Sequence, residues 1–291
     1  MDNEKWYQLS IKTNPEISDS ITDYLFEYGL EGIFLDKENI DKLSNQIKIT
    51  AFFTEGFLNK DNLENILKSE FTHLKQDDIS IQEVNTTDWV SDSQKHFEVF
   101  HVGKNLVFKP IWQDYKDKEE EIVIDFDPGS FFGSIPHPST RLCLEEIENI
   151  STSLNKDANI LDLGVGSGIL SLALYHLGFK KITAIDIDPV AIRSSEDNFS
   201  LNKMNVKLFL GEIKDCDDKY DFIAGNLLAQ TITELAEQIS EKLNDKGIFI
   251  AAGITRKQEV KIIDDLKQVN LIVSSKKYSD DWVLIRAIKE N

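Results

Sequence analysis

The segment Asn159–Ile169 holds the clearest chemical signal in the sequence. It reads NILDLGVGSGI, an apolar stretch followed at once by Gly164, Gly166 and Gly168. Glycines at such a turn let the backbone come close to a ligand, as nucleotide sites at the carboxyl ends of strands require. The dinucleotide fingerprint GxGxxG needs a glycine at position 169, where this chain has isoleucine. The spacing GxGxG therefore argues against a nicotinamide oxidoreductase.

Two carboxylates near the glycines further restrict the chemical classes of ligand that the turn could bind. Asp162 precedes Gly164 by two residues, where it would repel a pyrophosphate but suit an ammonium group, such as that of the methionine part of S-adenosylmethionine. A role in capping the turn is the alternative for Asp162. Asp186 ends the next apolar stretch and is placed to accept both hydroxyls of a ribose. Asp188, directly before Pro189, is expected to cap the helix that follows.

Asn226 offers a group for substrate chemistry. It follows the apolar segment 222–225, where its amide oxygen can accept a hydrogen bond from a nucleophilic amine and orient it. A turn or cap role is the alternative. Enzymes that methylate adenine N6 have Asn-Pro-Pro-aromatic at this point to stack a flipped base, and Leu227 and Leu228 offer no such platform. Glu212, after the preceding strand, is a candidate for a contact beside adenine or a simply exposed residue.

The charge of the chain favours a cationic partner. The 291 residues include 32 Lys and Arg against 51 Asp and Glu, a net charge of −19. Such a field repels polyanions, so direct nucleic-acid binding is disfavoured and a basic protein partner is favoured. The two cysteines, Cys143 and Cys216, cannot build a disulfide framework or a cysteine-based zinc site, and no apolar stretch resembles an export signal or a membrane span. We therefore expect a cytoplasmic protein.

The elements that position these groups are predicted from hydrophobic periodicity. In the first 86 residues the order is strand, helix, strand, strand, helix, strand. The predicted strands are Trp6–Ile11, Glu31–Asp36, Ile47–Phe53 and Ile79–Val84, and the predicted helices are Ile17–Tyr28 and Asp61–Phe71. This order is that of a small α+β ferredoxin-like domain, which we place at residues 1–86.

From Asp157 onward a different pattern appears, in which apolar strands alternate with amphipathic helices, and we place the second domain at residues 127–291. The predicted strands are Asn159–Leu163, Ile182–Asp186, Val206–Leu210, Phe222–Gly225 and Gly247–Ala252, followed by an antiparallel hairpin of Leu271–Lys277 and Trp282–Ile288. Repeated strand–helix units imply an α/β fold with a parallel sheet covered on both faces. Residues 87–126 are assigned to a linker with connecting strands, in which the charged run 116–121 is interpreted as a solvated connector near a domain boundary.

Several motifs together give the sequence a resemblance to a known family. DLGVGSGIL at 162–170, AIDIDP at 184–189 and GNLLA at 225–229 are similar to motifs of the class I methyltransferases, whose catalytic domain is Rossmann-like and seven-stranded. DPGSFFGSIPHPST at 127–140 resembles the signature of the PrmA family, the ribosomal protein L11 methyltransferases. Further matches are Asp88-Trp89, Pro110–Trp112, Ala252–Ile254 and Asp281-Trp282, so the resemblance covers nearly the whole chain in order.

The resemblance implies an activity and a set of site residues. Family members transfer methyl groups from S-adenosylmethionine to lysine side chains and the N-terminal amine of ribosomal protein L11, which their N-terminal domain recognises. Thr140 matches a cofactor-contacting threonine. Gly164 and Asp186 match the family's glycine-loop and ribose contacts, and Asn226 matches its contact at the end of the strand predicted at Phe222–Gly225. With Asp162 and Gly166 from the motif itself, these residues form the expected cofactor site, with Asn226 also positioning the amine. No metal is required, and we expect a monomer.

One departure from the family pattern leaves alternatives open. Where the family has Phe-Gly-Thr-Gly, this chain has Phe132-Gly-Ser-Ile135 followed by Pro136. A β-branched residue before proline is confined to extended conformations and cannot imitate a glycine at positive φ. The alternatives are the same chemistry on another basic protein, or a non-catalytic module that binds the ribosomal protein and has a degenerate cofactor pocket.

Overall fold

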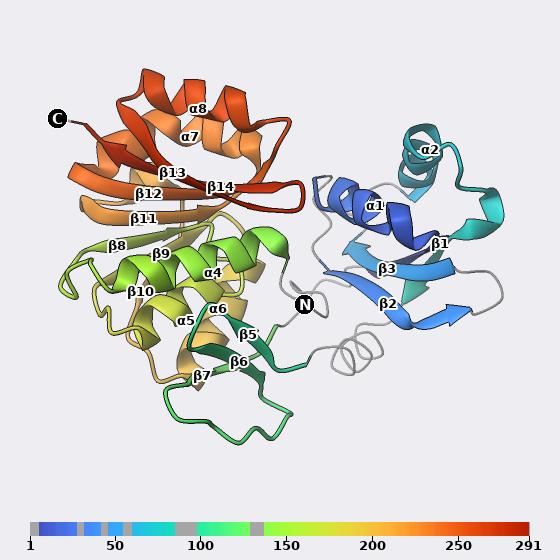
Figure 1. Cartoon of the computed structure of the whole chain (residues 1–291), viewed down its shortest axis with the longest axis horizontal. Coiled ribbons are helices and arrows are strands. Elements are labelled where there is room, and N and C mark those ends of the chain that lie inside the picture. The colour runs from blue at the N-terminus through green and yellow to red at the C-terminus, as the bar shows by residue number, and fades with distance from the viewer. Residues whose placement is uncertain are drawn as a thin grey trace. The chain divides into compact units, whose positions relative to one another are not determined.

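The computed structural model describes residues 6–27, 32–41, 46–54, 60–84, 98–128 and 137–290. This part of the chain divides into two compact units, the first made by residues up to 98 and the second by residues 99–127 and 137–290. Figure 1 labels the helices and strands of each unit. No helix within these ranges is long and apolar enough to cross a membrane. The domain limits predicted from the sequence stay a prediction.

The first unit is a four-stranded antiparallel sheet with two helices. Its elements are β1 (Trp6–Thr13), α1 (Pro15–Glu27), β2 (Gly32–Asp41), β3 (Gln46–Thr54), α2 (Lys60–Glu70) and β4 (Ile79–Val84). The strands lie in the order β2-β3-β1-β4. Alternating residues of β1 and β3, among them Leu9 and Ile49, form a buried core with apolar residues of both helices, such as Leu25 and Leu63. The predicted ferredoxin-like order of elements is therefore present.

The second unit is built on a seven-stranded sheet. Its strands are β8 (Ile160–Leu163), β9 (Ile182–Asp186), β10 (Lys207–Leu210), β11 (Tyr220–Asn226), β12 (Leu243–Thr255), β13 (Leu271–Ser279) and β14 (Trp282–Lys289). They lie in the order β10-β9-β8-β11-β12-β14-β13, in which β14 runs antiparallel to β12 and to β13 and the others are parallel (Figure 1). Each strand predicted by periodicity is found, with ends that differ by a few residues.

Helices connect the parallel strands and cover the sheet. They are α4 (Pro138–Ser151), α5 (Ile169–His176), α6 (Pro189–Leu201), α7 (Ala229–Lys242) and α8 (Glu259–Gln268). The strand order reverses between β8 and β11: β9 and β10 lie on one side of β8, and β11 and β12 lie on the other. Ligands of open α/β sheets bind at such a switch point, outside the carboxyl ends of the strands. The glycine turn follows β8 and Asn226 ends β11, so both lie there.

A small third sheet occupies much of the segment that the sequence assigned to a linker. It consists of β5 (Phe100–Val102), β6 (Leu106–Pro110) and β7 (Ile122–Phe126), with β6 antiparallel to β5 and parallel to β7. It contacts α4, α5 and α6 and is part of the second unit. The charged run 116–121 lies in the loop between β6 and β7, where Glu121 accepts hydrogen bonds from the Tyr115 hydroxyl and the Lys118 amide.

Candidate active site

The glycine turn between β8 and α5 has the backbone geometry that its sequence predicts. Gly164, Gly166 and Gly168 have φ values of +76°, +52° and +83°, a region that residues with a side chain rarely adopt. At Gly164 a Cβ would lie 2.4 Å from Cδ2 of Leu227, so a side chain there would force Leu227 to move. At Gly166 a Cβ would meet no atom of the described residues within 4 Å. The middle of the turn therefore borders open space that a ligand can fill.

Asp162, in β8, is fully buried and uses only one of its two oxygens in hydrogen bonds to the described residues. Oδ2 accepts hydrogen bonds from the backbone amide of Ser171 at 2.9 Å and from its hydroxyl at 2.6 Å, in the first turn of α5. Oδ2 therefore has the capping role that the sequence analysis left open as an alternative. Oδ1 is equally buried and has no hydrogen-bond partner in the described residues. Burial raises the pKa of this carboxyl to about 7, although the Ser171 hydrogen bonds oppose the shift.

Asp186, at the end of β9, joins the second strand to the glycine turn. Its Oδ2 accepts a hydrogen bond from the Gly166 amide at 3.0 Å, and its Oδ1 accepts one from the Asp188 amide at 3.0 Å. A carboxylate oxygen accepts at two positions, so both oxygens can still receive a ligand hydroxyl. Asp188 caps α6 by accepting from the Val190 amide at 2.7 Å, which confirms its predicted role. Between them, Ile187 exposes 73% of its surface, an apolar neighbour for a bound ring.

Asn226 and Thr140 are 86 residues apart in the sequence and meet in the structure. Thr140 lies in the first turn of α4, and its Oγ1 accepts a hydrogen bond from Nδ2 of Asn226 at 3.0 Å. This contact fixes the orientation of the Asn226 amide. Its Oδ1 is buried and accepts no hydrogen bond from the described part of the protein. The amide therefore presents an acceptor, suited to an N–H donor such as an amine.

His137 is a structural residue at the start of α4. Its Nδ1 accepts a hydrogen bond from the Ser139 amide at 3.3 Å and lies 2.8 Å from the Ser139 hydroxyl, so the ring caps the helix. The ring packs edge-on against Trp282, with centroids 4.3 Å apart. Burial lowers the pKa of His137 to about 3, which keeps the ring neutral in the pH range where an amine reacts.

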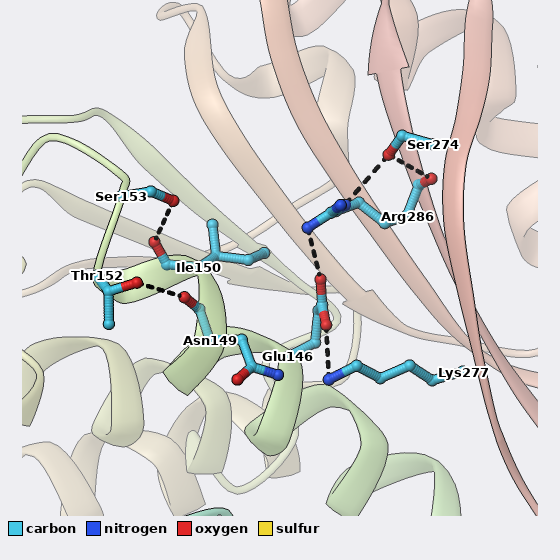
Figure 2. A network of polar contacts seen from close by, with 8 residues as sticks. All are labelled: Glu146, Asn149, Ile150, Thr152, Ser153, Ser274, Lys277 and Arg286. Atoms are coloured by element: carbon cyan, nitrogen blue, oxygen red, sulfur yellow. Dashed lines mark hydrogen bonds and ion pairs between the residues drawn. The ribbon is translucent and has the colours of Figure 1, made fainter.

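A buried ion cluster holds α4 against the C-terminal hairpin. Figure 2 shows the Glu146 carboxylate between Lys277 of β13 and Arg286 of β14, at 2.8 and 3.1 Å. Glu146 is 2% exposed, whereas the two cationic side chains are about a third exposed. Arg286 also donates from Nε to the Ser274 hydroxyl at 3.1 Å (Figure 2). The helix that carries Thr140 is therefore tied to the far edge of the sheet.

Two polar residues near the glycine turn were missed by the sequence analysis. The Ser167 hydroxyl, within the turn, is buried and has no partner among the described residues. Asn198 of α6 is fully buried and hydrogen-bonds to the backbone of Asp127 and Ser167. The signal that could have found it is the pair Asn198 and Asn202, spaced by one helical turn on a predicted helix.

Within the described ranges, the structure does not bring the remaining predicted residues into this cluster. Glu212 is half exposed and engaged locally, in an ion pair with Lys214 at 2.9 Å and in a capping box with Asp215, so no contact to a ligand is evident from its own geometry. The departure at 132–136 and the match at Asp88-Trp89 lie outside the described residues.

The fold and this cluster of residues define a class of protein. The strand order with one antiparallel strand, the GxGxG turn after β8, the carboxylate ending β9 and the polar end of β11 are together those of a class I methyltransferase domain. A family model described as ribosomal protein L11 methyltransferase (PrmA) matches residues 5–290. The chain belongs to this family, as its sequence motifs predicted.

Curated and solved relatives agree with this assignment. The ribosomal protein L11 methyltransferases of Caldicellulosiruptor saccharolyticus and Staphylococcus haemolyticus are each 30% identical to the chain. The alignments cover 98% and 96% of this chain and 100% and 97% of those proteins. The crystal structure of a ribosomal protein L11 methylase from Lactobacillus delbrueckii subsp. bulgaricus is 29% identical, with a TM-score of 0.62, covering 67% of this chain and all of that one.

Proposed function

We propose that this protein transfers methyl groups from S-adenosylmethionine to amines of ribosomal protein L11, namely lysine side chains and the N-terminal amine. The observation that carries the proposal is the pairing of Asn226 with Thr140 at the carboxyl edge of the sheet. Because Nδ2 is already engaged, Oδ1 is the group that faces a new partner, and an amine is a donor that suits it. The names of the relatives support the identity of the substrate protein.

The residues around the glycine turn fit the proposed cofactor. Asp186 would receive the ribose hydroxyls, and the turn at Gly164 and Gly166 would approach the methionine part. The buried Oδ1 of Asp162 has no hydrogen-bond partner among the described residues and suits the positive charge there, because a buried acceptor is costly until a donor reaches it. When bound, S-adenosylmethionine would supply a methyl group on a positively charged sulfur. The amine lone pair would form a bond to the methyl carbon as the bond from that carbon to sulfur breaks, and the sulfur would leave as a neutral thioether, in S-adenosylhomocysteine.

The chain's own part in the reaction is to position the amine. Oδ1 of Asn226 would accept one N–H of the neutral amine and so direct its lone pair, and Thr140 would keep the amide from rotating. Alignment and exclusion of water can supply most of the rate for such a displacement. His137 does not take part as a base, because its ring serves as a helix cap with a pKa of about 3. The ammonium product loses its proton to solvent.

The test is transfer of radiolabelled methyl from S-adenosylmethionine to purified, unmethylated ribosomal protein L11, with cofactor affinity measured by calorimetry in parallel. Labelled L11 and micromolar or tighter cofactor binding are expected. The variant Asp186→Ala should bind no cofactor, because it lacks the proposed ribose ligand.

Each other outcome points to a different function. If the protein binds the cofactor but does not label L11, the proposed substrate is wrong, and other basic proteins should be tested. No cofactor binding by the unaltered protein would favour a non-catalytic module that docks on the ribosomal protein.

A further inference from the structure

Asn198 connects two segments that the sequence separates widely. Its Oδ1 accepts a hydrogen bond from the Asp127 amide at 2.8 Å. Its Nδ2 donates to the carbonyl of Asp127 at 2.7 Å and to the carbonyl of Ser167 at 3.0 Å. All three partners are backbone groups, and the side chain is fully buried. One side-chain amide thus forms hydrogen bonds both with the backbone just after β7 and with the backbone of the glycine turn.

The contact to Ser167 bears directly on the geometry of the turn. The carbonyl of Ser167 belongs to the same peptide plane as the amide of Gly168, which donates to the carbonyl of Val165 at 2.8 Å, so holding the Ser167 carbonyl also supports the hydrogen bond that closes the turn. The start of the turn is held by β9, because Gly164 and Val165 donate to the carbonyl of Ile185 and Gly166 donates to Asp186. The glycine turn is therefore hydrogen-bonded to two elements, to α6 through Asn198 and to β9 through Asp186.

We propose that Asn198 is a positioning residue for the cofactor: it contacts no cofactor itself but holds the glycine turn in its binding conformation by fastening it to the end of β7. This inference rests on the proposed function, because it concerns the same cofactor site. A buried amide is well suited to this task, since two of its backbone partners need a donor and the third needs an acceptor.

Asn202, the residue that caps the C-terminal end of the same helix, provides a matched control. It lies one turn further along and donates from Nδ2 to the carbonyls of Asp125 at 2.7 Å and Asn198 at 2.9 Å. Its Oδ1 lies 3.1 Å from Nε2 of His176. Like Asn198 it fastens α6 to β7, but its hydrogen bonds do not reach the glycine turn.

The experiment compares Asn198→Ala, Asn198→Asp and Asn202→Ala with the unaltered protein, using calorimetry for the Kd of S-adenosylmethionine and chemical denaturation for stability. Loss of a buried hydrogen bond should raise the Kd of Asn198→Ala about 10-fold or more. Asn202→Ala should lose comparable stability with a Kd within about 2-fold of the unaltered protein. In steady-state assays the cofactor KM of Asn198→Ala should rise, whereas the KM for the substrate protein should not.

Asn198→Asp keeps the shape of the side chain and makes cofactor binding depend on pH, an effect that a merely structural role would not give. An ionised carboxylate faces two carbonyls and repels them, but its protonated form can donate to one. The ratio of its Kd to that of the unaltered protein should therefore shrink as the pH falls from 8 to 6.

Three results would overturn the inference. In the first, an Asn198 variant binds the cofactor as tightly as the unaltered protein. In the second, Asn202→Ala loses as much affinity as Asn198→Ala. If Asn198→Ala does not fold, Asn198→Asp decides, and a pH-independent Kd ratio near 1 refutes the role. Failure of the unaltered protein to bind S-adenosylmethionine would instead refute the proposed function, and this inference with it.

Discussion

At the scale of single residues, two buried groups near the candidate site have opposite pKa shifts. Burial lowers the pKa of His137 to about 3 and raises that of Asp162 to about 7. The unfolded chain therefore binds more protons at His137 between about pH 6.5 and 3, and stability from this residue is lost as the pH falls. The folded chain binds more protons at Asp162 between about pH 3.8 and 7, and stability from this residue is lost as the pH rises.

The two slopes oppose each other between about pH 4 and 6.5, which gives a testable consequence. Asp162→Asn removes one of them, so the stability of this variant should fall with acid by up to about 1.4 kcal/mol per pH unit more than that of the unaltered protein. Urea denaturation at pH 4.5, 5.5 and 6.5 measures the difference. Parallel stability curves for the two proteins would show that Asp162 has no raised pKa.

The same carboxyl predicts a pH dependence of cofactor binding. The ionised form of Asp162 attracts a cationic ligand, and below about pH 7 a proton must leave before the ligand gains that attraction. The affinity for S-adenosylmethionine should therefore rise from pH 6 to pH 8, by up to about 10-fold per pH unit below the pKa. Calorimetry at pH 6, 7 and 8 checks this, and Asp162→Asn should show a flat profile. An equally steep profile in that variant would assign the dependence to another group.

Asn226 and Thr140 make a second prediction at this scale. Asn226→Ala removes the proposed amine acceptor, so kcat should fall about 100-fold, the effect of misplacing a reacting group. Thr140→Ser keeps the hydroxyl that holds the amide and should retain most activity, whereas Thr140→Val removes it and should lose part of kcat. Steady-state kinetics with saturating cofactor distinguish the variants. Full activity of Asn226→Ala would refute the positioning role.

At the scale of elements, α4 connects the site to both flanks of the second unit. Thr140 is in its first turn, and Glu146 pairs with Lys277 and Arg286 of the C-terminal hairpin. Further along, the Glu148 carboxylate accepts from the amides of Lys104 and Asn105, at 2.6 and 2.8 Å, in the turn between β5 and β6. These contacts on α4 therefore add to the direct hydrogen bond in holding Thr140 beside Asn226.

The ion cluster at Glu146 predicts a loss of stability on mutation. Glu146→Ala leaves two cations without their partner and should cost about 2–3 kcal/mol, less than a fully buried pair because Lys277 and Arg286 reach solvent. Glu145→Ala, the neighbouring acid on α4, should cost less than about 1 kcal/mol. Urea denaturation near neutral pH compares the two. Equal losses would mean that the cluster contributes little.

At the scale of the whole molecule, the net charge of −19 should govern the encounter with a basic substrate. Opposite charges speed association, and salt screens the attraction. The KM for ribosomal protein L11 should therefore rise several-fold between about 50 and 300 mM salt, where the Debye length falls well below about 10 Å. The cofactor Kd, set by buried contacts, should change far less. A substrate KM independent of salt would show that charge does not guide recognition.

The local order of the chain was readable from the sequence to a large extent. Hydrophobic periodicity gave the βαββαβ order of the first unit and the strands of the seven-stranded sheet, and the GxGxG spacing identified the turn at Gly164. The cap at Asp188 was predictable because a helix start depends only on residues next to it. The sheet formed by β5, β6 and β7 was not predicted as a unit, since short strands of three to five residues carry little periodicity.

What the sequence determined by itself is therefore the family, the types of element and the residues of the glycine turn, because these depend on local patterns. Only the tertiary structure decided which strands are neighbours, that Thr140 holds the Asn226 amide, and that one oxygen of Asp162 caps α5 while the other has no partner within the described ranges. It also revealed the three backbone contacts of Asn198. The physical reason is that a side chain's hydrogen-bond partners and burial are set by long-range packing, which sequence spacing does not encode.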